Sequence, residues 1–385
     1  MAHRPTHRYV ATTSLGLEGV LAEELNALGA TAVVPWAGGA SFEGDRHLMM
    51  RACLWLRTAH RVRWILDECQ VRTQDDLYPV ARRVARWERL CPPDRTIAVR
   101  ASLRQAPFQD ERIVALKVKD AIVDTVRDSV GTRPDVSGKD PDVGIHVRLS
   151  GSRATFSLDA AGQSLHIRGY RTQSGPAPLR ETLAAGALLM SGWDGTRPLV
   201  DPMCGSGTLL VEGALIATGR APGLEREFGF QRWPNYRARA WEEIRQEAVE
   251  AIRPSEVALV GREVSARVLA YAQGNAKRAG VGEVVRWEQG RMEETRRPDG
   301  PAGLFVTNPP YGERLGDRES AEEVYRQLGG LMGRAFSGWR ATLFVAERRH
   351  RDAVGLEVLH EAPVKNGALD VVLCAYQTSP WGGSE

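Results

Sequence analysis

The 385-residue sequence lacks the features that would mark a secreted or a membrane protein. It has no apolar run long enough for a signal peptide or a bilayer span, because arginine, glutamate or glycine interrupts each early apolar stretch. Its five cysteines are far apart and show neither the paired spacing of a disulfide framework nor that of a zinc site. These absences predict a cytoplasmic protein with reduced thiols and no bound metal.

Positive charge is concentrated in the N-terminal part of the chain. Residues 1–172 contain 25 lysines and arginines against 20 acidic residues, whereas the rest of the chain contains 26 against 28. This excess favours a polyanionic partner, although an ordinary solvated surface gives the same count.

The N-terminal part alternates short strand-like and helix-like segments, which is typical of small α+β units. Apolar residues at helical spacing or in alternation define these segments. The predicted strands lie at 7–12, 31–36, 40–44, 96–103, 144–151 and 153–162, and the predicted helices at 14–29, from about Asp45 through residue 66, at 75–90 and at 112–131.

From about residue 176 a regular strand-then-helix repeat begins, and it predicts a parallel, doubly wound α/β sheet. Near the C-terminus two strand-like segments flank Asn366-Gly367, a dipeptide that favours a tight hairpin turn. The sheet is therefore expected to finish in an antiparallel edge. The expected boundary between the two parts is the loop at residues 171–178.

The segment DPMCGSGT, residues 201–208, joins the end of an apolar strand to the start of a helix. Gly205 and Gly207 would let the backbone approach a ligand, and the helix N-terminus offers free N–H groups. This arrangement predicts a nucleotide-type cofactor site at the carboxyl edge of the sheet. Tight strand-to-helix turns also need glycine, so the G-x-G spacing alone is weak evidence.

Glu263 ends the next predicted strand, where it should lie beside Asp201 and can accept hydrogen bonds from ribose hydroxyls. A dinucleotide site would place such an acid about 20 residues after the turn, whereas Glu263 follows Asp201 by 62 residues. The spacing therefore disfavours a simple NAD site. Asn275, in the following helix, is explained most simply as a cap or pin for that helix.

The segment TNPPYGER, residues 307–314, follows another predicted strand. Pro309 and Pro310 stiffen the chain as it leaves the sheet. The side-chain oxygen of Asn308 and the carbonyl of Pro309 can then accept hydrogen bonds from the exocyclic amine of a nucleic-acid base, which is a preorganised arrangement for methylating it. Tyr311 is placed to stack on a base flipped or splayed out of its helix. An isolated Asn-Pro-Pro is more often a simple turn, but here it follows two acidic strand ends in a β/α series.

These motifs resemble those of class I S-adenosylmethionine-dependent methyltransferases, with DPMCGSGT as the cofactor loop and NPPY as the amino-methylating motif. Longer segments are similar to bacterial THUMP-domain rRNA guanine-N2 methyltransferases of the 23S rRNA methyltransferase L type. Those segments include ALKVKDAIVDTVRD, SLHIRGYR, APLRETLAAGALLMSGWDG and APGLEREFGFQRW. The resemblance implies an α/β, Rossmann-like class I methyltransferase domain at 171–385. A ferredoxin-like region at 1–60 and a THUMP RNA-binding domain at 61–170, both α+β, would precede it.

By that resemblance the chain would transfer a methyl group from S-adenosyl-L-methionine to the N2 amine of a guanine in 23S rRNA or a large-subunit precursor. The implied catalytic residues are Asn308, Pro309, Pro310 and Tyr311. The implied cofactor-binding residues are Arg180, Glu181, Thr182, Asp201, Met203, Gly205, Gly207, Thr208, Glu263, Met292 and Asn308. The expected phosphate contacts are Lys117, Lys119, Arg133, Lys139, Arg168 and Arg171.

One position departs from the family pattern. After the strand at 284–289 the family places an aspartate that accepts from the adenine amine, and this chain has Arg291, which cannot accept. The backbone around Met292 or the carboxylate of Glu293 would have to take that role. Three alternatives stay open: a tRNA guanine-N2 methyltransferase, a DNA amino-methyltransferase acting on adenine N6 or cytosine N4, and a noncatalytic RNA-binding assembly factor, which is the one that Arg291 favours. The intact NPPY segment favours an enzyme.

Overall fold

The computed structural model describes residues 5–106, 108–173, 179–311 and 318–378. Their contacts divide the chain into two compact units that are interleaved along the sequence. Unit 1 consists of Met1–Thr12, Ala22–Leu165 and Glu227–Gln246, and unit 2 of Thr13–Leu21, His166–Arg226 and Glu247–Glu385. The loop expected at 171–178 lies mostly outside the described residues, and the three consecutive domain ranges stay a prediction.

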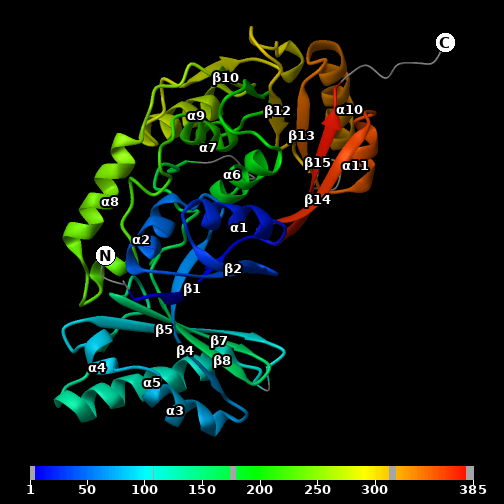
Figure 1. Ribbon diagram of the computed structural model, residues 1–385. Coiled ribbons are helices and arrows are strands. Elements are labelled where there is room, and N and C mark those ends of the chain that lie inside the picture. Colours follow the sequence, from blue (N-terminus) through cyan, green and yellow to red (C-terminus); the bar gives the residue numbers. More distant parts are fainter. Residues whose placement is uncertain (1–4, 107, 174–178, 312–317, 379–385) are drawn as a thin grey trace. The chain divides into compact units, whose positions relative to one another are not determined.

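Unit 1 is built on an eight-stranded mixed sheet with the order β2-β3-β1-β4-β8-β7-β5-β6 (Figure 1). Strand β5 pairs in parallel with β6 and β7, and the other neighbours are antiparallel. The strands are β1 (His7–Thr12), β2 (Thr31–Trp36), β3 (Gly39–Gly44), β4 (Arg61–Gln70), β5 (Thr96–Arg104), β6 (Asp135–Val136), β7 (Val143–Ser150) and β8 (Arg153–Asp159).

Helices cover one face of this sheet. Figure 1 shows α3, α4 and α5 together on one side of β4, β5, β7 and β8. Val114, Val118 and Ile122 on α5 are completely buried, as are Ile97 and Val147 on the strands that this helix covers. The described helices of this region are α1 (Glu18–Ala27), whose residues are divided between the units, α2 (Arg46–Trp55), α3 (Gln74–Arg83), α4 (Trp87–Leu90) and α5 (Glu111–Val130).

The predicted helix from Asp45 through residue 66 is wrong in its second half. Asp45 does cap α2, since its carboxylate accepts from the Leu48 amide at 2.8 Å, but the helix ends at Trp55. Residues 61–70 instead form β4, which hydrogen-bonds to β1 on one side and β8 on the other. Val62 is buried while Arg61 and Arg63 flank it, so the local alternation fits a strand, and pairing on both edges overrides helical propensity. The predicted helix at 75–90 is likewise divided into α3 and α4.

Unit 2 contains the predicted Rossmann-like sheet, with seven strands in the order β11-β10-β9-β12-β13-β15-β14. The first five are parallel, and β15 is antiparallel to both β13 and β14, which confirms the edge hairpin. Gly367 has φ +67° at the hairpin turn. The strands are β9 (Leu199–Asp201), β10 (Leu259–Glu263), β11 (Val285–Gln289), β12 (Leu304–Thr307), β13 (Arg340–Val345), β14 (Val358–Asn366) and β15 (Leu369–Gln377).

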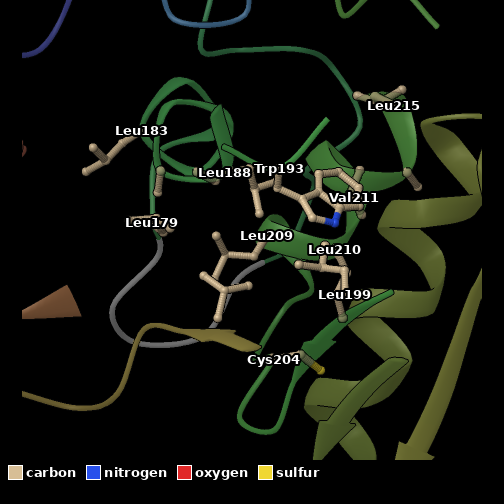
Figure 2. Close-up of a cluster of buried hydrophobic side chains, with 14 of the residues drawn as sticks. Leu179, Leu183, Leu188, Trp193, Leu199, Cys204, Leu209, Leu210, Val211 and Leu215 are labelled. Atoms are coloured by element: carbon tan, nitrogen blue, oxygen red, sulfur yellow. The ribbon is translucent and has the colours of Figure 1, made fainter. Parts of the chain in front are cut away.

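Two apolar cores hold the helices of unit 2 against its sheet. One contains side chains of α6, α7 and α9, and Figure 2 shows its residues Leu199, Leu209, Leu210 and Trp193 packed together. The other contains Phe305 with side chains of α10 and α11. The remaining described helices are α6 (Glu181–Met190), α7 (Thr208–Ala217), η1 (Gly229–Arg232), α8 (Ala238–Glu250), α9 (Ala266–Arg278), η2 (Met292–Glu294), α10 (Arg318–Ala335) and α11 (Arg348–Ala353).

The strand order locates the most suitable ligand site. The chain moves from β9 to β10 on one side, and β12 then pairs on the other side of β9. Doubly wound sheets bind ligands at such a switch point, outside the carboxyl ends of the strands. None of the helices in the described parts of the chain combines the length and apolar character that a bilayer span requires.

Candidate active site

The turn after β9 contains two glycines in the left-handed backbone conformation. Gly205 has φ +54° and Gly207 has φ +82°. A Cβ atom on Gly207 would lie 2.7 Å from the Trp287 ring and 2.9 Å from the Ala272 side chain, so this position also lacks space for a larger residue. Thr208 then begins α7, whose N-terminus faces the turn. The sequence DPMCGSGT therefore folds as the strand, turn and helix that a nucleotide-type site requires.

Two carboxylates end adjacent parallel strands beside this turn. Strand β10 pairs with β9, with Gly261 opposite Asp201, so Glu263 follows in the position expected for it. The Glu263 carboxylate accepts from the amides of Gly205 at 3.2 Å and Ser265 at 2.9 Å. Each oxygen keeps a second lone pair, so the carboxylate fixes the turn and can still accept from a ligand.

Asp201 is the more buried of the two acids, with 2% of its surface exposed. Burial raises the pKa of its carboxyl to about 7, and the negative charge of Glu263 acts in the same direction. Hydrogen bonding from the Thr307 side chain and the Met203 amide opposes this rise in the pKa. Near neutral pH the Asp201 carboxyl is therefore only partly ionised, and a cation placed beside it would favour the ionised form.

The predicted target-binding segment begins where β12 ends at Thr307. The Tyr311 hydroxyl donates a hydrogen bond to the side-chain oxygen of Asn308. The Tyr311 ring is 8% exposed and belongs to the apolar core, Pro309 is buried and Pro310 is exposed. The structure thus brings Asn308 and Tyr311 into direct contact. Residues 312–314 of this segment lie outside the described residues.

Asn275 has a larger role than the sequence interpretation gave it. Its amide is completely buried and donates to the carbonyls of Ser206 at 3.0 Å and Gln173 at 3.3 Å. Its side-chain oxygen accepts from Arg278 at 2.6 Å. The cap of α9 is Ser265 instead, so Asn275 connects this helix to the glycine turn. The sequence signal for this role was the position of Asn275 itself, near the end of the helix that follows Glu263.

Three family models match consecutive parts of the chain. One describes an RMKL-like methyltransferase domain and matches residues 168–375, more than half of the chain. The others describe an RlmL ferredoxin-like domain at 8–63 and a THUMP domain at 71–159. The chain belongs to the RMKL-like methyltransferase family. The Rossmann-like methyltransferase fold, preceded by ferredoxin-like and THUMP domains, is confirmed by these matches.

Similar proteins place the family match in context. The chain is 41% identical over 376 residues to the "Ribosomal RNA large subunit methyltransferase K/L" of Photobacterium profundum. That alignment covers 96% of this chain and 53% of the relative, so the chain spans about half the length of this relative. A solved putative methyltransferase complexed with SAH is 28% identical, with a TM-score of 0.88 over 98% of this chain and 100% of the other. A predicted N6-adenine-specific DNA methylase from Listeria monocytogenes is 30% identical, with a TM-score of 0.87 over 98% of this chain and 97% of the other.

The first two residues of α6 are buried in this chain. Glu181 is 4% exposed and forms an ion pair with Arg171, whose Nη2 lies 2.6 Å from the carboxylate, and Thr182 is fully buried. Arg180, at the N-cap of α6, is half-buried and is the accessible member of this expected group. Cofactor binding by Arg180, Glu181 and Thr182 stays a prediction, and Arg180 is the residue of the three that a ligand could most easily reach.

The six expected phosphate contacts have different surroundings. Lys117 lies 3.4 Å from Asp75, Lys119 lies 2.5 Å from Asp120, and Arg133 and Lys139 are exposed on unit 1. The expectation for Arg168 is corrected by its surroundings. This residue of unit 2 is 3% exposed and pairs with the buried Glu212 at 3.6 Å. It cannot reach a phosphate without leaving that pair. Arg171 is likewise engaged with Glu181. The amino-acid sequence alone does not show which charged side chains pair with each other when they are far apart along the chain.

The position that departs from the family pattern lies at the start of η2. Arg291 is an exposed N-cap residue, and Met292 is 8% exposed within the core that contains Phe305. Glu293 is exposed, whereas Glu294 forms an ion pair with Arg262 at 3.1 Å. Met292 thus offers an apolar side chain and Glu293 an accessible carboxylate after β11, and which of them replaces the missing acid stays a prediction. Within the described residues no three His, Cys, Asp or Glu side chains converge as metal ligands.

Proposed function

We propose that this chain transfers the methyl group of S-adenosyl-L-methionine to the exocyclic N2 amine of a guanine in 23S rRNA. The observation that carries this proposal is the convergence of Asp201, Glu263 and Asn308 after three neighbouring strands, β9, β10 and β12. The name of the Photobacterium relative supports the RNA substrate, and the SAH-bound neighbour supports the cofactor.

The residues around the glycine turn fit such a cofactor. Asp201 and the turn through Met203, Gly205, Gly207 and Thr208 would hold the methionine part, whose ammonium group suits a carboxylate of adjustable charge. The second lone pairs of Glu263 would accept from the ribose hydroxyls. Met292 would contact the adenine. When bound, S-adenosylmethionine supplies an electrophilic methyl group on a sulfonium.

The segment after β12 would position the target amine. The Asn308 side-chain oxygen and the Pro309 carbonyl would accept from the guanine amino group, which directs its lone pair at the methyl carbon. The two prolines hold these acceptors in place before the base arrives. The amine proton can leave to solvent after the carbon–nitrogen bond forms, so no side chain with an unusual proton affinity is needed.

A second candidate is methylation of a DNA amino group, which uses the same acceptor arrangement. It is favoured by the likeness to the Listeria protein described as a predicted N6-adenine-specific DNA methylase. The THUMP match at residues 71–159 favours RNA. A substrate in ribosomal RNA would also place the chain in the cytoplasm.

The test is methyl transfer from labelled S-adenosylmethionine to 23S rRNA, tRNA and DNA from cells that lack this gene, followed by nucleoside analysis. The expected result is N2-methylguanosine in 23S rRNA, which should be absent when the Asn308→Ala variant is used. Label in tRNA or DNA alone would replace the substrate and retain the chemistry. Failure to label any nucleic acid, together with failure to bind SAH, would favour a noncatalytic RNA-binding factor.

A further inference from the structure

The face of the unit 1 sheet opposite α3 and α5 gathers arginine side chains from several strands. In the parallel pair of β5 and β7, Arg100 is opposite His146, Ser102 is opposite Arg148, and Arg104 is opposite Ser150. Directly opposed residues project to the same face of a sheet. Arg100, Arg104 and Arg148 therefore share one face, and Arg63 on β4 reaches it from the other side of β8.

The pKa of His146 reflects the positive charge on this face. Burial lowers the pKa of its imidazole to about 3, and the positive charges of Arg63, Arg61, Arg148 and Arg100 contribute in the same direction. Burial lowers the pKa of Arg63 to about 10; the negative charge of Asp159 opposes this, and the neighbouring arginines act in the same direction as burial. These cations lie close enough to repel one another in the free protein.

Acidic residues on this face neutralise other arginines. Asp159 pairs with Arg61 at 2.6 Å, and Glu68 pairs with Arg8 at 3.1 Å. Among the residues that the structure describes, no carboxylate forms an ion pair with the remaining cations of this face, which include Arg153 opposite Ser150. Four of these cations, which we call the arginine face, are Arg63, Arg100, Arg104 and Arg148.

The helix-covered side of the same unit is different, because several of its basic residues are paired with acids. Arg82 lies 2.7 Å from Asp128, and Arg127 lies 2.8 Å from Asp124. Lys117 and Lys119 also have acidic neighbours, at 3.4 Å and 2.5 Å. These four helix-side cations thus form ion pairs with acids, which the four members of the arginine face do not form within the part of the chain that the structure describes.

The outer members of the arginine face are accessible, and one of them is held in position. Arg100 and Arg104 are exposed, and Arg148 is half-buried. The Arg148 guanidinium lies 4.2 Å from the centre of the Trp36 ring, a cation–π contact that limits its motion. Guanidinium groups match phosphate oxygens in a two-pronged geometry, so several of them on one face suit a chain of phosphates.

We propose that the arginine face binds the phosphate backbone of the RNA substrate, with Arg100, Arg104 and Arg148 in direct contact. This inference rests on the proposed function, which supplies the RNA, and it moves the main contact away from the helix-side lysines Lys117 and Lys119. A bound strand of phosphates would relieve the electrostatic repulsion among these arginines. This relief would add to the free energy of RNA binding. The partner is RNA because a THUMP domain lies in this unit and the proposed reaction consumes RNA.

The test compares full-length variants for binding to in-vitro-transcribed 23S rRNA at salt concentrations between about 50 and 200 mM. The triple variant Arg100→Ala, Arg104→Ala, Arg148→Ala should bind more than tenfold more weakly. The slope of log affinity against log salt should fall by about 0.7 to 0.9 for each phosphate contact removed. The double variant Arg82→Ala, Arg127→Ala removes the same residue type from the helix side and should match the wild type. SAH binding in unit 2 and the circular dichroism spectrum check that the variants fold.

The outcomes separate this inference from the proposed function. If the triple variant keeps the wild-type affinity and salt slope while both proteins methylate rRNA, the arginine face is overturned and the proposed function stands. Loss of binding in Lys117→Ala, Lys119→Ala with the triple variant unaffected also overturns it. If no rRNA is methylated but the triple variant alone loses affinity and slope, the surface is supported and the proposed reaction fails. Equal losses for rRNA and for duplex DNA of matched length would overturn the assignment to RNA.

Discussion

The hydroxyl of Tyr311 donates a hydrogen bond to the side-chain oxygen of Asn308, the atom proposed to accept from the target amine. The same ring, proposed to stack on the target base, is only 8% exposed. Binding of a base would therefore require Tyr311 to rotate outward, which frees the Asn308 oxygen and presents the ring in one motion.

This contact predicts different effects for two substitutions at Tyr311. Tyr311→Phe keeps the ring and removes the competing donor, whose net contribution is about 0.5–1.5 kcal/mol. Its single-turnover rate of methyl transfer to 23S rRNA should equal the wild-type rate or exceed it by up to about tenfold. Tyr311→Ala also removes the stacking surface and should be slower. A Phe variant as inactive as Asn308→Ala would mean that the hydroxyl takes a direct part in the reaction.

The raised pKa of Asp201, about 7, predicts that cofactor affinity depends on pH. Below that pH the carboxyl is largely protonated and attracts the ammonium group of the cofactor less strongly. Affinity for S-adenosylmethionine should therefore rise as the pH rises through 7, approaching about tenfold per pH unit on the acidic side. Isothermal titration across this range measures it. Asp201→Asn should bind more weakly and lose this dependence, and an unchanged profile in that variant would assign the titration to another group.

The two glycines of the turn should differ in their tolerance of alanine. Gly205→Ala places a Cβ in open space at φ +54°, so the cost is backbone strain of about 1–2 kcal/mol. Gly207→Ala adds the close approaches to Trp287 and Ala272 to that strain. The second variant should lower Tm further and weaken SAH binding by at least tenfold. Equal Tm and affinity in the two variants would contradict the proposed packing of Trp287 against the turn.

The lowered pKa of His146, about 3, predicts acid sensitivity of unit 1. In the unfolded chain this imidazole takes up a proton near its ordinary value of 6.5, whereas in the fold it stays neutral. Stability should therefore be complete above pH 6.5 and fall below it, by at most about 1.4 kcal/mol per pH unit for this residue. His146→Gln should show a shallower fall in Tm between neutral and acidic pH. An identical fall in both proteins would exclude His146 as the cause.

The methyltransferase half of the fold follows from local sequence signals. The central strands β9, β12 and β13 contain short apolar runs, and Asp201, Glu263 and Asn308 come at or just after strand ends, so their placement at one edge of the sheet follows from topology. The hairpin could also be predicted from Asn366-Gly367, although the turn residues are Gly367 and Ala368, because Asn366 pairs with Leu369.

Interactions between distant segments could not be predicted in this way. β4 is a strand because β1 and β8 pair with both of its edges, and this pairing overrides a local pattern that also suits a helix. That error concealed the arginine face, since Arg63 joins Arg100 and Arg148 only when residues 61–70 are extended. Arg168 shows the same limit, because it lies outside the helices and strands and its partner Glu212 lies in α7.

The interleaving of the two units has a consequence for synthesis on the ribosome. Unit 1 includes residues 227–246, where Phe228, Phe230 and Trp241 pack against one another, so its last segment emerges only after β9 and α7 have been made. Unit 2 in turn includes residues 13–21, which emerge near the start. Neither unit can be completed before a large part of the other has been translated. A nascent chain arrested before residue 227 should therefore hold an unfinished N-terminal unit, and nascent chains of increasing length should reach full protease resistance in unit 1 only after residue 246 has left the exit tunnel.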